Sequence, residues 1–301
     1  MNPYPMYPYY GKETKCEEKP LSFPPQHQDQ QPGLEYVMSP RPLYDNPSYV
    51  GSCKLQNRVA LITGGDSGIG RATAVAFAKE GADVAFAYLY EEQDAQETRT
   101  RIEQLGRRCL PLRADLRTKA ACTAIVEQTL HHFGKLDVLV NNIGVQYPQH
   151  SLLDITEQQL EQTFRTNIFS FFFVTQAALP CLRPGSSIIN TASVTAYRGE
   201  KTLIDYSATK GAVVSFTRSL ALSVVDQGIR VNAVAPGPTW TPLIPASYSA
   251  ERVATFGTDT PMHRAGQPFE LAPAYVYLAS DDSRYVTGET MHVNGGSFIT
   301  S

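Results

Sequence analysis

Short hydrophobic runs alternate with longer amphipathic stretches along most of the chain. The first run, RVALIT at residues 58–63, leads into a glycine-rich stretch. Short apolar runs bounded by turn residues predict buried strands, and the longer stretches predict helices. The predicted strands are residues 58–63, 83–88, 108–114, 136–140, 186–191, 230–235 and 289–293. Helices are predicted at 68–79, 91–105 and 119–133.

Strands that are apolar throughout and alternate with helices indicate a parallel sheet covered on both faces. Right-handed crossovers then produce a doubly wound, Rossmann-type α/β sheet of about seven parallel strands. No internal repeat interrupts this pattern, so we expect one domain over residues 51–301.

Residues 1–50 differ from the rest of the chain. They are rich in Pro, Tyr and Gln and lack a helix or strand period. This composition fits a disordered tail. It also fits an extended arm that packs on the domain, because tyrosine side chains carry much apolar surface. The tyrosines concerned are Tyr4, Tyr7, Tyr9, Tyr10, Tyr36, Tyr44 and Tyr49. Both interpretations stay open.

Composition excludes several classes of protein. Lys and Arg total 26 and Asp and Glu total 29, which leaves a net charge of −3. This balance does not favour binding to nucleic acid or to a membrane through basic residues. The most apolar stretch, residues 168–182, is too short and too polar to span a bilayer, and is expected to be a buried or interfacial helix.

The five cysteines suggest neither a disulfide framework nor a metal site, because they are odd in number and lack CxxC spacing. They are Cys16, Cys53, Cys109, Cys122 and Cys181. The N-terminus has no basic region followed by an apolar run, so we expect a cytoplasmic protein.

A glycine-rich loop, TGGDSGIG at residues 63–70, joins the first strand to the first helix. Gly64 allows the tight turn, Gly68 lets the backbone approach a pyrophosphate, and Gly70 lets helix and strand pack closely. The helix N-terminus offers N–H groups to phosphate oxygens. No Lys-Ser/Thr pair follows, so this is not a P-loop. By itself the loop is also compatible with a structural turn.

Tyr206 and Lys210 lie four residues apart and therefore share one helix face. An ammonium group beside a phenol favours the phenolate, which would lower the pKa of Tyr206 and make it a general acid/base. Ser193 follows the strand at 186–191, at the sheet edge where such folds bind ligands. Asn167 lies within a predicted helix. A solvated Tyr–Lys pair and a turn serine are the alternatives.

Together with the glycine loop, Asn167, Ser193, Tyr206 and Lys210 resemble the catalytic tetrad of the short-chain dehydrogenase/reductase family. The resemblance covers residues 55–300. It implies that Tyr206 is the acid/base and that Ser193 orients the substrate. It also implies that Lys210 lowers the pKa of Tyr206 and holds the nicotinamide ribose, and that Asn167 anchors a water of the proton relay.

The same resemblance implies a cofactor site. Its residues are Gly64, Asp66, Ser67, Gly68, Ile69, Gly70, Tyr88, Asp115, Leu116, Asn142, Gly144, Tyr206, Lys210, Pro236, Gly237, Thr239 and Thr241. The chain departs from the family pattern at Ile143, where Ala is usual, and at Asn294, where Asp is usual.

The cofactor is expected to be NADP or NAD. A carboxylate at the end of the second strand would exclude a 2′-phosphate, and Tyr88 occupies that position. Ser67 offers a hydroxyl to the phosphate, Arg71 either helps or covers the helix face, and Asp66 opposes the negative charge. This balance favours NADP(H).

The loop and the arm resemble a bacterial branch of the family whose members are named glucose or ribitol dehydrogenase homologues, general stress proteins and aldehyde reductases. We therefore expect an NAD(P)-dependent oxidoreductase that interconverts an alcohol and an aldehyde or ketone. A sugar or polyol dehydrogenase working oxidatively is the alternative, and a non-catalytic dinucleotide-binding regulator is a third.

The substrate is expected to be a small molecule that meets Gln146, Tyr147, Val194, Tyr197 and a lid at residues 240–260. No charged cluster is evident in this lid. The family resemblance also implies a homotetramer built on the helices that carry Asn167 and Tyr206. Phe169, Phe171, Phe172 and Phe173 suit such an interface or the core.

Overall fold

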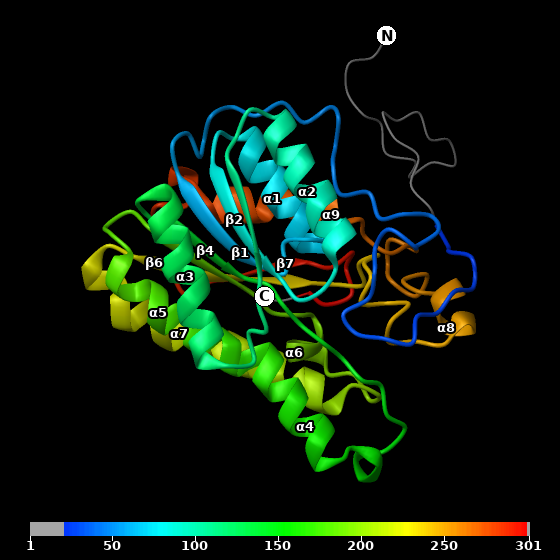
Figure 1. Cartoon of the computed structure of the whole chain (residues 1–301). Helices are drawn as coiled ribbons and strands as arrows, with labels where there is room; N and C mark the ends of the chain where they lie inside the picture. The colour runs from blue at the N-terminus through cyan, green and yellow to red at the C-terminus, as the bar shows by residue number, and fades with distance from the viewer. Residues whose placement is uncertain (1–20, 300–301) are drawn as a thin grey trace.

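The structure, a computed structural model, describes residues 21–299 and contains a parallel sheet of seven strands in the order β3-β2-β1-β4-β5-β6-β7 (Figure 1). The strands are β1 (Val59–Thr63), β2 (Asp83–Tyr88), β3 (Cys109–Arg113), β4 (Val138–Asn141), β5 (Ser187–Thr191), β6 (Arg230–Pro236) and β7 (Thr290–Val293). The predicted doubly wound α/β sheet is confirmed.

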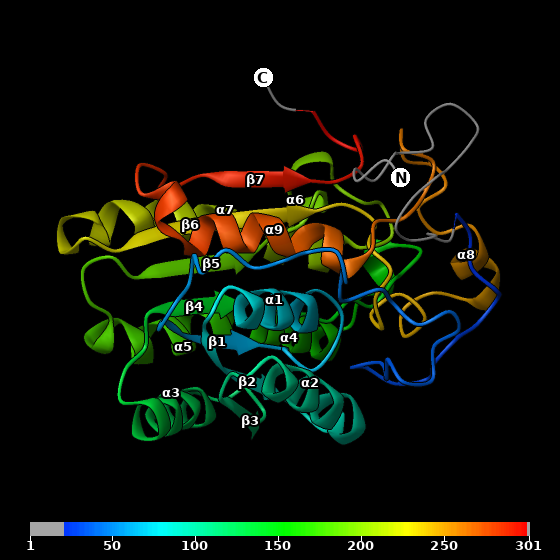
Figure 2. The same ribbon diagram turned by 90° about the horizontal axis from the view of Figure 1, so that it is seen from above.

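Helices cover both faces of the sheet, with α1, α2 and α9 in one layer and α3, α5 and α7 in the other (Figures 1 and 2). The helices are α1 (Gly68–Lys79), α2 (Glu92–Gln104), α3 (Lys119–Phe133), α4 (Glu157–Phe164), α5 (Ser170–Ala178), α6 (Thr195–Arg198), α7 (Ile204–Val224), α8 (Ala250–Ala254) and α9 (Pro268–Ala279).

Strand β1 shows why the strands are apolar throughout. Its residues alternate between the two faces of the sheet. Ala60 and Ile62 join the core beneath α1 and α9, whereas Val59 and Leu61 join the core beneath α3 and α5. Every residue of β1 is buried, so a polar side chain on either face would lose its contact with water.

The strand order reverses direction beside β1, because β2 lies on one side of it and β4 on the other. Loops leaving such a pair of strands go to opposite faces of the sheet and open a crevice at the carboxyl ends of the strands. Thr63, Asn141 and Thr191 are the last residues of β1, β4 and β5 at this edge.

Residues 21–50 form no helix or strand, and run as an extended segment past α8 and along the domain (Figure 1). The Phe23 ring stacks on Trp240, with 3.7 Å between ring centroids. Trp240 Nε1 donates a hydrogen bond to the Pro40 carbonyl at 2.9 Å. The arm interpretation therefore describes residues 21–50, and Tyr44 and Tyr49 pack against the core. Tyr4, Tyr7, Tyr9 and Tyr10 lie outside the described residues.

The apolar stretch at 168–182 contributes to a π-helical turn at Arg165–Phe169, to α5, and to a short 3₁₀ turn. Phe171 is buried in the core, whereas Phe169 and Phe172 are about two-fifths exposed. Among residues 21–299, no helix has both the length and the apolarity needed to cross a membrane.

Candidate active site

A cleft of about 380 Å³ opens at the carboxyl edge of the sheet, within the usual range for ligand pockets. The predicted cofactor residues all line it except Gly70. Of the predicted catalytic residues, Ser193, Tyr206 and Lys210 line the cleft and Asn167 does not. The fold thus gathers residues from the glycine loop, from three strand ends and from α7.

The glycine loop has the conformation that its sequence predicts. Gly64 and Gly68 have φ values of +67° and +51°, a region that favours glycine. A Cβ on Gly70 would lie 1.8 Å from the Gly64 carbonyl oxygen, so only glycine permits this close packing of helix on strand. Gly70 therefore shapes the loop from beneath the cleft.

The start of α1 fits a dinucleotide phosphate. The Gly68 N–H donates to the Glu35 carboxylate at 2.7 Å. Within the described part of the chain, no acceptor receives the N–H groups of Ile69 and Gly70. N–H groups at a helix N-terminus bind anions, so the loop retains the donors that a pyrophosphate requires.

Arg71 does not face the cleft, contrary to one of the roles considered for it. Its side chain is fully buried and forms ion pairs with Glu35 at 2.7 Å and Asp94 at 3.2 Å. Its Nε also donates to Thr98 Oγ1 and to the Asp66 carbonyl. The guanidinium is therefore committed to the interior and cannot bind a 2′-phosphate.

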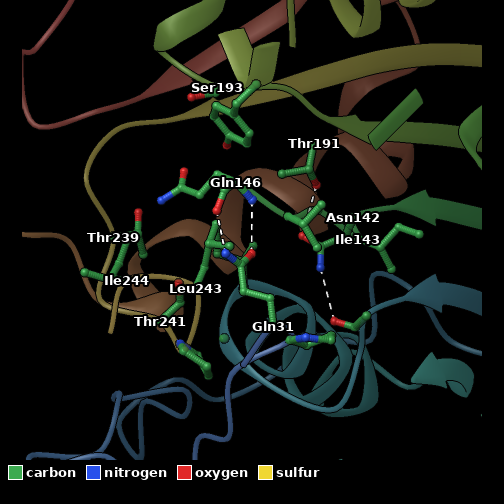
Figure 3. Close-up of a pocket in the computed structure, with 18 of the residues that line it drawn as sticks. Gln31, Asn142, Ile143, Gln146, Thr191, Ser193, Thr239, Thr241, Leu243 and Ile244 are labelled. Carbon is green, nitrogen blue, oxygen red and sulfur yellow. Dashed lines mark hydrogen bonds between the residues drawn. The ribbon is translucent and has the colours of Figure 1, made fainter. Parts of the chain in front are cut away.

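The amide of Asn142 connects three strand ends. Asn142 Nδ2 donates to the Gly64 carbonyl at 3.1 Å, and Thr191 Oγ1 donates to Asn142 Oδ1 at 3.1 Å. The Asn142 N–H donates to Thr63 Oγ1 at 2.9 Å. This network ties the ends of β1, β4 and β5 together at the floor of the cleft (Figure 3).

Ser193 follows β5, while Tyr206 and Lys210 project from the first turns of α7. Lys210 Nζ donates to the Thr191 carbonyl at 2.8 Å and lies 5.6 Å from the centroid of the Tyr206 ring. Ser193 Oγ accepts from the Thr195 N–H at 3.1 Å, and the Ser193 hydroxyl acts to lower the pKa of the Tyr206 phenol. These three side chains come together as the spacing predicts.

Burial shifts the pKa of both groups on α7. It raises the pKa of Tyr206 to about 12, and Ser193 acts in the opposite direction. It lowers the pKa of Lys210 to about 7. The net direction for Tyr206 is therefore opposite to the expected lowering, because burial dominates the shift; the contribution of Lys210 stays a prediction. The expectation considered the neighbouring charge alone, whereas burial disfavours the charged form of both groups, the ammonium of Lys210 and the phenolate of Tyr206.

Asn167 lies in the π-helical turn between α4 and α5. Its Oδ1 accepts from the Val145 N–H and its Nδ2 donates to the Val145 carbonyl, both at 2.8 Å. Nδ2 also donates to Thr209 Oγ1 on α7 at 3.2 Å. The side chain thus holds the segment after β4 against α7, beside Lys210. Its predicted part in a water relay stays a prediction.

The segment after β6 passes over the glycine loop. The Thr241 methyl would lie 3.0 Å from a Cβ on Gly68. Thr239 Oγ1 donates to the Gly237 carbonyl at 3.0 Å, and Thr239 and Thr241 both face the cleft (Figure 3). Where the adenosine is expected, the Tyr88 hydroxyl donates to Glu92 at 2.8 Å, and Asp115 pairs with Arg117 at 2.6 Å.

The substrate side differs in part from the prediction. Gln146 and Val194 line the cleft, but Tyr147, Tyr197 and Trp240 do not. The Tyr197 ring packs against His292 and Phe298, and Trp240 is fully buried.

Two groups of lining residues were missed in the sequence. One is a charged set from separate segments: Arg198, Glu200, Arg252 and Asp259. The other is Gln31, Pro32 and Gly33 of the N-terminal segment. The sequence did not indicate either group, because the residues are far apart along the chain and only tertiary packing brings them to the cleft.

Curated relatives match nearly the whole chain. General stress protein 39 of Bacillus subtilis (strain 168) is 55% identical over 94% of this chain and 99% of its own. The glucose and ribitol dehydrogenase of Daucus carota is 50% identical over 92% of this chain and 97% of its own. The chloroplastic NADPH-dependent aldehyde reductase 1 of Arabidopsis thaliana is 50% identical over 92% and 98%.

Solved structures share the fold. A short-chain dehydrogenase from Burkholderia cenocepacia J2315, in complex with NADP, is 32% identical with a TM-score of 0.76, over 81% of this chain and 98% of its own. A 3-ketoacyl-(acyl-carrier-protein) reductase from Brucella melitensis, complexed with NADH, is 32% identical with a TM-score of 0.74, over 81% and 100%.

The family described as enoyl-(acyl carrier protein) reductase matches residues 64–297, from the glycine loop to the turn after β7. That span contains the cleft floor, Ser193, helix α7 with Tyr206 and Lys210, and the segment over the glycine loop. The chain therefore belongs to the short-chain dehydrogenase/reductase family, and either nicotinamide cofactor, NAD or NADP, fits its site.

Proposed function

We propose that this NAD(P)-dependent oxidoreductase interconverts small-molecule alcohols and carbonyls with Tyr206 as general acid/base, Ser193 as the substrate-orienting group and Lys210 as the cation beside them. The observation that carries the proposal is the meeting of these three side chains in one cleft with the glycine loop. A bound nicotinamide would supply or accept the hydride.

In the reducing direction, the Tyr206 hydroxyl gives its proton to the carbonyl oxygen as negative charge develops there. A hydrogen bond from Ser193 steadies that oxygen. The phenolate left behind is stabilised by the Lys210 ammonium, 5.6 Å from the ring centroid. Because burial raises the pKa of Tyr206 to about 12, the phenol carries its proton at neutral pH.

Replacing Tyr206 with Phe tests the assignment. We expect Tyr206→Phe to lower kcat for aldehyde reduction by about a hundredfold or more, because general acid catalysis contributes roughly that much. The cofactor Kd should stay within about twofold of the wild type. Steady-state kinetics and NAD(P)H fluorescence measure both quantities.

Tyr197→Phe is the matched control. The Tyr197 hydroxyl is buried without a partner among the described residues, and its ring packs outside the cleft. The activity of Tyr197→Phe should equal that of the wild type. Normal turnover by Tyr206→Phe would refute the assigned role.

A sugar or polyol dehydrogenase working oxidatively is the second candidate. The glucose and ribitol dehydrogenase relative supports it, as do Gln146, Glu200 and Asp259 at the cleft, because these groups can hydrogen-bond several hydroxyls. Turnover of glucose or ribitol with NAD(P)⁺, exceeding reduction of simple aldehydes in kcat/KM, would favour this candidate.

We propose NADP(H) as the preferred cofactor. Ser67 and Tyr88 both line the cleft. Burial and the nearby Glu91 carboxylate raise the pKa of Asp66, which favours its protonated form and weakens its repulsion of a 2′-phosphate. The NADPH-dependent relative agrees with this preference.

Ser67→Ala tests the cofactor preference. It should weaken NADPH binding by about tenfold, the scale of one hydrogen bond to a charged group, and leave NADH binding unchanged. Fluorescence titration with each cofactor measures both constants. A wild-type enzyme that prefers NADH tenfold would overturn the preference.

We further infer a homotetramer and a cytoplasmic location. The former is supported by exposed apolar residues on α5 and α7, including Phe172 and Leu222. The latter is supported by four free cysteines among the described residues, as expected where thiols stay reduced.

A further inference from the structure

The N-terminal segment contributes directly to the cleft. Gln31, Pro32 and Gly33 line it together with the glycine loop and the strand ends. The Gln31 side chain points toward Gln146 (Figure 3). These residues precede the first strand by more than twenty positions, so the chain passes over the site before it enters the sheet.

Gln31 uses its whole amide to join two parts of the active site. Its Oε1 accepts from the Gln146 N–H at 3.1 Å, and its Nε2 donates to the Gln146 carbonyl at 2.5 Å. The same Nε2 donates to the Ala246 carbonyl at 3.2 Å. Gln146 follows β4, whereas Ala246 belongs to the segment that crosses the glycine loop.

Close packing reinforces this connection. A Cβ on Gly33 would lie 2.4 Å from the Pro242 carbonyl oxygen. The Gln28 N–H donates to the Pro245 carbonyl at 2.9 Å. The N-terminal segment therefore packs against residues 242–246, and these contacts extend as far as the cleft.

Glu35 connects the N-terminal segment to the start of α1. Its carboxylate is fully buried and accepts from the Gly68 N–H and from Arg71, both at 2.7 Å. Its own N–H donates to Asp94 Oδ2 at 2.7 Å. Removing one partner from a buried ion pair leaves an uncompensated charge. Separating the N-terminal segment from the glycine loop would therefore cost much free energy.

We propose that Gln31 and Glu35 are positioning residues of the active site. Gln31 holds the segment around Ala246 closed over the substrate, and Glu35 holds the glycine loop in its cofactor-binding conformation. The part concerning the substrate rests on the proposed carbonyl–alcohol chemistry. The part concerning the cofactor requires only dinucleotide binding.

The isosteric variant Gln31→Glu tests the first contact. The variant replaces Nε2, which donates to the Gln146 and Ala246 carbonyls, with a carboxylate oxygen that repels both carbonyl oxygens. We expect KM for an aldehyde to rise about tenfold with kcat within about twofold, because roughly one to two hydrogen bonds are lost. Cofactor Kd should not change. Protease cleavage within residues 240–257 should accelerate.

Gln30→Glu is the matched control. Gln30 is the exposed neighbour, and the variant carries the same added charge. It should leave KM, Kd and protease cleavage unchanged. Equal KM values for the two variants would overturn the role of Gln31, whereas a fall in melting temperature with unchanged KM would show a structural role only and overturn it as well.

Glu35→Gln tests the second contact without any turnover. Its NADPH Kd, measured by fluorescence, should rise about tenfold, since a charge-assisted hydrogen bond to the loop is lost. Glu103→Gln is the control, because Glu103 forms an exposed ion pair with Arg99 on α2. An unchanged Kd in Glu35→Gln would overturn the role of Glu35.

The KM of Gln31→Glu depends on turnover, whereas the NADPH Kd of Glu35→Gln does not, so the two measurements separate this proposal from the proposed function. A wild-type protein that reduces no carbonyl and oxidises no alcohol would contradict the proposed chemistry and, with it, the substrate role of Gln31. The Kd of Glu35→Gln would still decide whether the N-terminal segment shapes the cofactor site.

Discussion

Lys210 illustrates how the position proposed for a catalytic residue conflicts with folding. Its ammonium group is placed where a phenolate needs a cation, yet it is buried between the Phe171 and Tyr206 rings, 5.7 and 5.6 Å from their centroids. Burial lowers its pKa from 10.5 to about 7. The charged form therefore costs folding free energy, as expected of a residue with the catalytic role that we propose for Lys210.

Lys210→Met should make this cost visible. The pKa of Lys210 is about 7 in the folded state and 10.5 in the unfolded state. Between pH 7 and 10.5, Lys210 is therefore protonated in the unfolded chain and largely neutral in the folded protein. Wild-type stability therefore rises with pH across that window. Methionine, which never ionises, should stabilise the fold by about 3 kcal/mol more at pH 6.5 than at pH 9.5.

Urea unfolding of both proteins at pH 6.5 and pH 9.5 measures the difference, and turnover should be lost at both pH values. The same stability difference at the two pH values would contradict a buried ammonium with a lowered pKa.

At the scale of elements, the start of α1 depends on the absence of one side chain. Helix α1 begins at Gly68, and Gly70 allows its first turn to touch the Gly64 carbonyl at the end of β1. The contact holds the loop N–H groups at the cleft edge. The π-helical turn around Asn167 is a second local device, since π turns often occur at functional sites.

Gly70→Ala should abolish this contact, because the new Cβ would lie 1.8 Å from the Gly64 oxygen. We expect NADPH affinity to fall by at least about tenfold as the loop shifts. Gly211→Ala on α7 is the control, since nothing lies within 4 Å of its Cβ position. It should stabilise α7 by about 0.5–1 kcal/mol without changing Kd.

Fluorescence titration measures affinity, and thermal unfolding shows that both variants are folded. Wild-type affinity in Gly70→Ala would show that the close contact is dispensable.

At the scale of the whole molecule, one face carries unpaired apolar surface. Phe169, Phe172 and Leu222 are 41%, 43% and 80% exposed. The Phe172 and Phe216 rings lie 4.3 Å apart across α5 and α7, so the exposed Phe172 ring borders both helices. Apolar patches of this kind mark interfaces, and here the partner we propose is a second copy of the chain.

Phe172→Arg should break that interface. An arginine there would be desolvated in the assembly, so we expect the proposed tetramer to become smaller species by light scattering. Val50→Arg provides the control, because Val50 is also apolar and 83% exposed but lies on the N-terminal segment. An unchanged mass for Phe172→Arg would place the interface elsewhere.

The sequence by itself determined the sheet, the glycine loop and the Tyr206–Lys210 pair. Each depends on local rules: α1 and α3 begin and end where the pattern predicts, and four residues of spacing place Tyr206 and Lys210 on one helix face. These features need no knowledge of distant contacts.

Only the tertiary structure decided the direction of the pKa shifts, the fate of Arg71 and the role of the N-terminal segment. Burial depends on what covers a side chain, and the residues that cover Arg71, such as Glu35, are 36 positions away. Gln31 reaches Gln146 across 115 positions. No local pattern encodes such contacts, because they arise from the packing of already formed elements.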